Sequence, residues 1–85
     1  NAAWQYDLGI SHERTGSVFQ AQGELGLALE AFQSKKAIIE RLAAQDPTNA
    51  AWQRDLSVSH NKIGDVLLAQ GDAGGALAAY RAQIE

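Results

Sequence analysis

The chain carries one sequence segment twice, at a spacing of 48 residues. When residues 1–37 are aligned with residues 49–85, 18 of the 37 pairs are identical, and both copies open with the run Asn-Ala-Ala-Trp-Gln. A repeat of this length indicates one supersecondary unit that buries its apolar face against the next copy. The sequence therefore predicts two related helical hairpins, 1–48 and 49–85, the second of them cut short in its last helix.

Each copy has the pattern of two amphipathic helices. In the first helix of each copy, one stripe of residues recurs at steps of three and four, which is the period of an α-helix. The stripe comprises Trp4, Leu8, Ser11 or His12, Thr15, Phe19 and Gln22, and its counterpart comprises Trp52, Leu56, Ser59 or His60, Ile63, Leu67 and Gln70. We expect these stripes to face the core.

The ends of the helices are marked by residues that favour turns. Gly23 and Gly71 follow the first helix of each copy, where an achiral residue can close a helix in the left-handed conformation. Asp72 suits the N-cap of the last helix, and Pro47 separates the two copies. The second helix of the first copy carries its apolar side at Leu25, Ala28, Leu29, Phe32, Ile39, Leu42 and Ala43. The expected helices are 1–22, 25–45, 49–70 and 73–85.

The composition excludes several classes of protein. Hydrophobic residues make up 46% of the chain and charged residues 20%, which is typical of a folded globular protein rather than a disordered one. A net charge of -3 with scattered basic residues disfavours nucleic acid as a partner. The chain has no cysteine for a disulfide framework and no apolar run that could span a bilayer. We therefore expect a cytoplasmic protein with no membrane partner.

The spacing of small and large residues resembles the tetratricopeptide repeat (TPR) family. The positions that carry the resemblance are Gly16, Phe19, Gly23, Ala28 and Phe32 in the first copy and Gly64, Leu67, Gly71, Ala76 and Tyr80 in the second. The family unit has about 34 residues, so a unit of 48 residues is similar to a long-armed variant, as in bacterial TPR arrays, with about two extra turns on each arm. The resemblance implies an all-α solenoid of four antiparallel helices.

The resemblance also implies where a ligand would bind. In this family, peptides lie in a groove lined by the first helix of each repeat, and the matching positions are Glu13, Ser17, Gln20, Asn61, Asp65 and Leu68. Glu13 and Asp65 are acidic, so a peptide with a C-terminal carboxylate is disfavoured and a neutral or basic peptide is favoured. The alternative is that these six residues are simply solvated.

Other residues could carry chemistry, but their spacing argues against it. Asp7, Ser11 and His12 are the residue types of a hydrolytic triad, yet adjacent helical residues point about 100° apart, so the serine and histidine cannot easily meet. His12 and His60 lack the further ligands that a metal site needs. We expect no enzymatic activity, no metal and no cofactor, and we expect each imidazole to lie between helices and hydrogen-bond to a neighbour.

Two further pairs have alternative interpretations. Trp4 and Trp52 could anchor a peptide, but their place on the apolar stripes favours core packing. Lys35 and Lys36 are expected on a solvated face.

The preferred functional hypothesis is a protein-interaction scaffold, a fragment of a larger repeat array that binds an unidentified protein or peptide. The first helix opens with the same apolar stripe as the internal copy, so neither end of the fragment has a polar cap. Exposed apolar ends favour association. The alternative hypothesis is therefore a self-assembly element that forms homo-oligomers through these ends and has no heterologous ligand.

Overall fold

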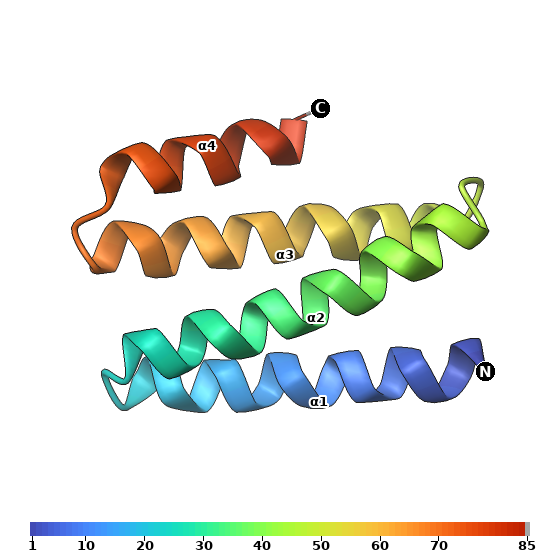
Figure 1. Cartoon of the computed structure of the whole chain (residues 1–85), viewed down its shortest axis with the longest axis horizontal. Coiled ribbons are helices and arrows are strands. Elements are labelled where there is room, and N and C mark those ends of the chain that lie inside the picture. The colour runs from blue at the N-terminus through green and yellow to red at the C-terminus, as the bar shows by residue number, and fades with distance from the viewer. Residues whose placement is uncertain (85) are drawn as a thin grey trace.

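A computed structural model describes residues 1–84 and contains four α-helices. The helices are α1 (Ala2–Ala21), α2 (Leu25–Gln45), α3 (Ala50–Ala69) and α4 (Ala73–Ile84), as Figure 1 shows. The described part of the chain has no strand, so the all-α class is confirmed. Every helix end among these residues lies within one residue of its expected place, and the expected end of the last helix at Glu85 lies outside them.

Side chains cap three of the helices. The Asn1 Oδ1 atom accepts a hydrogen bond of 2.9 Å from the Trp4 backbone N–H, and Asn49 repeats this contact with Trp52 at 3.1 Å. Asp72 Oδ1 accepts a hydrogen bond of 2.8 Å from the Gly75 N–H at the start of α4. Such caps satisfy backbone donors that have no partner within the helix. The predicted role of Asp72 is confirmed.

The two interhelical turns within the hairpins depend on glycine. Gly23 and Gly71 have φ angles of +79° and +87°, in the left-handed region that L-residues with a side chain rarely adopt. The Glu24 N–H then donates to the Phe19 carbonyl at 2.8 Å, and Asp72 repeats this bond with Leu67 at 2.9 Å. These bonds close α1 and α3, and they confirm the predicted glycine turns.

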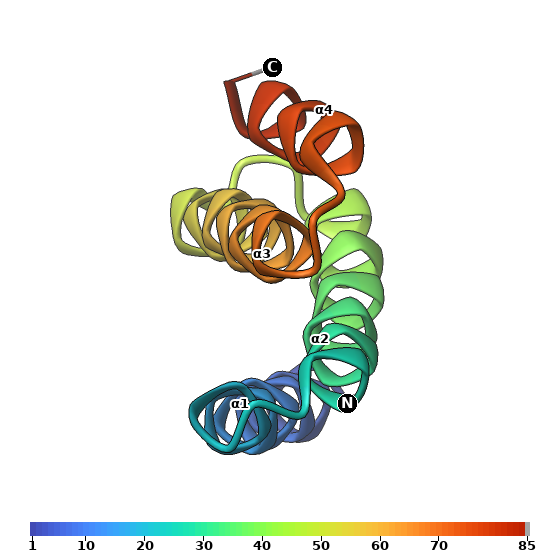
Figure 2. The same ribbon diagram turned by 90° about the vertical axis from the view of Figure 1, so that its left-hand side faces the viewer.

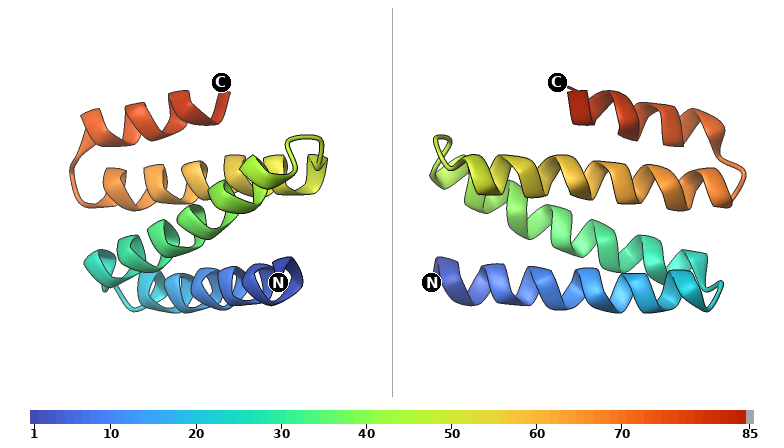
Figure 3. Two further views of the ribbon diagram at one scale, coloured as in Figure 1. Left: turned by 45° about the vertical axis from the view of Figure 1, so that its right-hand side comes forward. Right: turned by 180° about the vertical axis from the view of Figure 1, so that it is seen from behind.

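Consecutive helices pack against each other, so that α2 lies between α1 and α3. Figure 2 shows α1 and α3 on one side of the molecule and α2 and α4 on the other. In Figure 3, α2 crosses obliquely between α1 and α3 in both views. No helix among residues 1–84 combines the length and the apolar character that crossing a membrane would require.

The core consists of two clusters along α2. Near the glycine turns, Ala28 and Phe32 of α2 pack with Ile63 and Val66 of α3. Near the turn between the copies, a second cluster is formed by Ile38, Ile39 and Leu42, with Ala2 and Tyr6 of α1 and Trp52 and Leu56 of α3 packed against it. The apolar residues of α2 therefore contact both neighbouring helices, which confirms the core expected for this helix.

A glycine in each hairpin lies directly against an aromatic ring. A Cβ atom built on Gly16 would lie 2.7 Å from Cε1 of Phe32, and one built on Gly64 would lie 2.5 Å from Cε1 of Tyr80. These distances are well inside van der Waals contact, so each ring occupies the space of the missing side chain. The two contacts are 48 residues apart and hold α1 to α2 and α3 to α4 in the same way.

Candidate functional site

The six residues expected to bind a peptide lie on α1 and α3, the two helices that form one side of the molecule (Figure 2). Ser17, Gln20, Asn61, Asp65 and Leu68 are exposed, whereas Glu13 is only partly so. The two acidic residues of the set, Glu13 and Asp65, each bind another side chain of their own hairpin. Peptide binding at these six positions remains a prediction.

Glu13 forms an ion pair with Lys35 across the first hairpin. The Lys35 Nζ atom lies 2.6 Å from Glu13 Oε1, and the Lys35 side chain is only 2% exposed. The expectation that Lys35 lies on a solvated face is therefore wrong, and Lys36 is half-buried. The physical reason is that α2 packs between two helices, so a residue on its α1 side is buried and needs an acidic partner there.

In the second copy, Asp65 of α3 likewise has a partner on the neighbouring helix of its own hairpin, α4. The Tyr80 hydroxyl donates a hydrogen bond of 2.5 Å to Asp65 Oδ1. This bond is the first cause of a raised pKa for Tyr80. The Asp65 carboxylate therefore helps to hold α4 against α3.

A second carboxylate acts on a tyrosine between α1 and α3. Asp55 raises the pKa of Tyr6, first as a hydrogen-bond acceptor, with burial of the phenol and the Asp55 charge as further causes. The Oδ2 atom of Asp55 is buried and has no hydrogen-bond partner, and neither has the buried Ser59 hydroxyl. Tyr6 itself packs against the second core cluster on α2.

Most of the apolar stripe of α1 does not face the core, although its Phe19 packs against the core cluster near the glycine turns. Trp4 is 63% exposed, and Leu8, Ser11, Thr15 and Gln22 on the same stripe are exposed as well. The counterpart stripe of α3 is largely covered, because Trp52 and Leu56 pack against α2. Core packing was therefore a wrong prediction for Trp4 and a correct one for Trp52. The reason is position, since α3 lies between two helices and α1 has α2 as its main neighbour.

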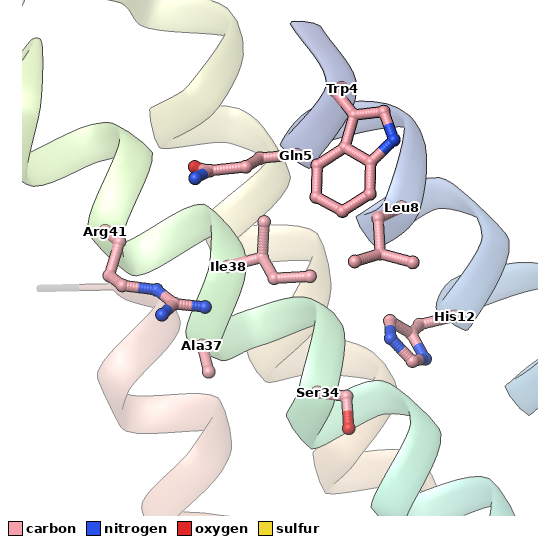
Figure 4. A pocket seen from close by; sticks show the side chains of 8 residues that line it. All are labelled: Trp4, Gln5, Leu8, His12, Ser34, Ala37, Ile38 and Arg41. Carbon is pink, nitrogen blue, oxygen red and sulfur yellow. The ribbon is translucent and has the colours of Figure 1, made fainter. Parts of the chain in front are cut away.

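The exposed stripe of α1 forms one wall of a groove with α2. This groove, which we call the Trp4 groove, has a volume of about 500 Å³. It is lined by Trp4, Gln5, Leu8 and His12 of α1 and by Ser34, Ala37, Ile38 and Arg41 of α2. Figure 4 shows Trp4 and Leu8 projecting from α1 toward Ile38 on the opposite helix. The centre of the groove is therefore apolar.

The polar groups of the Trp4 groove are uncharged or basic. Arg41 contributes a permanent cation, His12 contributes an imidazole, and no acidic side chain lines the groove. An apolar groove with a few polar groups at its edge is the usual form of a site that binds another molecule. The chemistry available is binding of apolar side chains together with recognition of an anionic group.

The two histidines differ in their surroundings. His12 lines the Trp4 groove, whereas His60 lies beside α2, where burial is the first cause of a lowered pKa and the charge of Lys36 is the second. Among residues 1–84, neither imidazole forms a hydrogen bond, so the expected hydrogen-bonded neighbours are not found. Both are half-buried, which agrees with the expectation that they lie between helices.

Sequence reasoning did not single out the α2 wall of the groove. Ser34, Ala37 and Arg41 have no pattern that distinguishes them from other surface residues of a helix. The signal that could have found the groove was the stripe of α1, whose Trp4 and Leu8 repeat residues of α3 that pack against α2.

Comparisons of the chain with protein-family models, with characterised proteins and with solved structures give no match.

Proposed function

We propose that this chain is a protein-interaction scaffold in which two TPR-like hairpins, stacked as the start of an α-solenoid, bind a segment of a partner protein. The observation that carries the proposal is the Trp4 groove, where a largely exposed tryptophan lies beside Leu8 and Ile38. The proposal includes no catalytic step and no cofactor.

The energetics of a large exposed aromatic residue support this function. Tryptophan is over-represented among the residues that dominate binding energy at protein interfaces. Trp4 gains little for folding, because most of its surface remains in water. Covering an aromatic side chain in a complex stabilises that complex by about 25 cal/mol for each Å² of apolar surface removed from water. The free-energy gain of burying Trp4 is therefore available to a partner.

Site-specific photo-crosslinking can identify this partner. A photoreactive amino acid at position 4 would be compared with the same group at Gln33, an exposed position that does not line the groove. The protein captured only from position 4 would then be purified and its affinity measured by calorimetry. We expect Trp4→Ala or Leu8→Ala to weaken binding about tenfold or more.

Two control variants make the result specific. Leu27 is an exposed leucine of α2 outside the groove, so Leu27→Ala should leave the affinity unchanged. Leu68 belongs to the surface expected from sequence, and Leu68→Ala tests that surface separately. An affinity that is insensitive to changes at Trp4 and Leu8 would show that the groove is not the binding surface.

A second candidate function is self-assembly through the outer helices. Val18 on α1 is 56% exposed and Leu77 on α4 is half exposed, so each end of the row of helices carries bare apolar surface. Sedimentation velocity over a wide concentration range tests this candidate. Self-assembly predicts oligomers that Leu77→Ser dissociates, and a monomer at every concentration excludes it.

A further inference from the structure

The residues that α2 packs against α3 indicate which kind of surface fits the apolar stripe that the two copies share. Trp52 and Leu56 of α3 pack against the cluster of Ile38, Ile39 and Leu42 on α2. Further along, Ile63 and Val66 of α3 pack with Phe32 and Ala28 of α2. One antiparallel helix therefore covers most of this face of α3 with apolar residues at helical spacing.

The corresponding face of α1 carries similar residues but lacks this cover. Trp4, Leu8 and Val18 are identical in type to Trp52, Leu56 and Val66, which lie 48 residues later. Val66 is fully buried, whereas Val18 is 56% exposed. The face that α2 covers on α3 is therefore open on α1, from Trp4 near one end to Val18 near the other.

The charged residues near the two stripes indicate which charge a helix that covers α1 should carry. Burial and the charge of Lys36 lower the pKa of His60 on α3, and the charge of Glu40 on α2 raises it by a smaller amount. The counterpart of His60 on α1 is His12, which lines the Trp4 groove together with Arg41. A helix that placed an acidic residue where Glu40 lies would therefore meet two basic groups on α1 and α2.

A second copy of this chain fits the stripe poorly. The outer helices that such a copy could offer are α1 and α4. Helix α4 carries Arg81 and no acidic side chain. Docking α4 of a second copy would therefore leave His12 and Arg41 without an acidic partner.

We propose that the Trp4 groove binds an amphipathic helix of the α2 pattern, supplied by the partner protein. This inference rests on the proposed function and names the partner segment. The helix runs antiparallel to α1, places two large aliphatic residues three apart over Trp4 and Leu8, and carries an acidic residue between them that faces His12 and Arg41. An aromatic residue seven positions before the first aliphatic one covers the stripe near Val18.

A synthetic peptide with the sequence of residues 25–45 is the probe for this inference. The peptide is labelled with a fluorophore, and its anisotropy is measured as the complete 85-residue chain is added. We expect saturable binding, no binding of a scrambled peptide of equal composition, and binding about tenfold weaker or more when Ile39 in the peptide is replaced by aspartate. Replacing Glu40 of the peptide with glutamine should weaken binding to a smaller extent.

Variants of the protein locate the peptide. Leu8→Asp should weaken binding about tenfold or more, whereas Leu27→Asp, an equivalent change on an exposed leucine outside the groove, should not. Circular dichroism verifies that both variants keep their helices. Binding that survives Leu8→Asp would overturn the inference, because the peptide would then be replacing α2 of the protein rather than covering α1.

Three other outcomes would also overturn it. If the chain forms a dimer that Leu8→Asp dissociates, the occupant of the groove is a second copy. If the peptide does not bind while the protein captured by crosslinking at position 4 still depends on Trp4, the proposed function stands and the helical form of the ligand is wrong. If neither the peptide nor any partner depends on Trp4, the proposed function fails as well.

Discussion

Gly16 and Phe32 are in contact across the first hairpin, so closely that a Cβ atom on the glycine would lie 2.7 Å from the ring. Phe32 is almost fully buried between α1 and α3 and cannot turn away. Gly16→Ala should therefore lower the free energy of unfolding by about 1–3 kcal/mol, as overpacking usually does. Chemical denaturation measures this change.

Gly9 provides the matched control for this variant. It is buried on the same helix, but a Cβ atom there would lie 3.5 Å from Lys35, which is an ordinary contact. Gly9→Ala should leave stability unchanged or raise it by up to about 1 kcal/mol, because alanine favours a helix over glycine. Equal destabilisation by both variants would mean that the close contact of Gly16 does not determine the cost.

The buried ion pair of Lys35 and Glu13 gives a second prediction. Glu13→Gln leaves the Lys35 ammonium group buried without its anion, and should destabilise the fold by about 1–3 kcal/mol because the partner site is partly open to water. Lys35→Met removes the charge and keeps an apolar chain of similar length, so it should cost less. Denaturation curves of the two single variants and the double variant test this order, and a larger loss for Lys35→Met would contradict it.

His60 makes stability depend on pH. Burial lowers its pKa below the ordinary value of 6.5, so the unfolded chain binds the proton more readily than the folded one. Its contribution is complete above pH 6.5 and is lost as the pH falls from there through the lowered pKa of the folded state. His60→Gln should remove this part of the acid sensitivity in denaturation curves measured across that range, and His12→Gln should retain it.

The two tyrosines of the chain report on two different contacts. The pKa of Tyr6 is raised chiefly by Asp55, and that of Tyr80 chiefly by Asp65. Ultraviolet titration should show both phenols ionising above pH 10, their ordinary value. Asp55→Asn should lower the pKa of Tyr6 only, and Asp65→Asn that of Tyr80 only. A shift of the same tyrosine by both substitutions would contradict these pairings.

The helix boundaries could be predicted from the sequence because their causes are local. Asparagine caps, glycine turns and the break at Pro47 act within a few residues along the chain, and each determines where a helix begins or ends. The apolar side of α2 was also predictable, since its period is helical and both of its neighbours are in the chain.

The candidate site could be predicted only in part, because burial depends on what packs against each helix. Trp4 and Trp52 have almost the same sequence neighbours, so no local pattern distinguishes an exposed tryptophan from a covered one. Lys35 was placed on the surface for the same reason, although packing of α1 buries it beside Glu13. Arg41 enters the groove only through the crossing of two helices, which the sequence pattern does not contain.

Fluorescence of the two single-tryptophan variants tests the central claim most directly, namely that α1 presents an open binding face. In Trp52→Phe, the remaining Trp4 should emit at the wavelength of a solvated indole and be quenched readily by acrylamide; in Trp4→Phe, Trp52 should be blue-shifted and protected. Adding the peptide of residues 25–45 should then protect Trp4. A free chain in which Trp4 is as shielded as Trp52 would contradict the account.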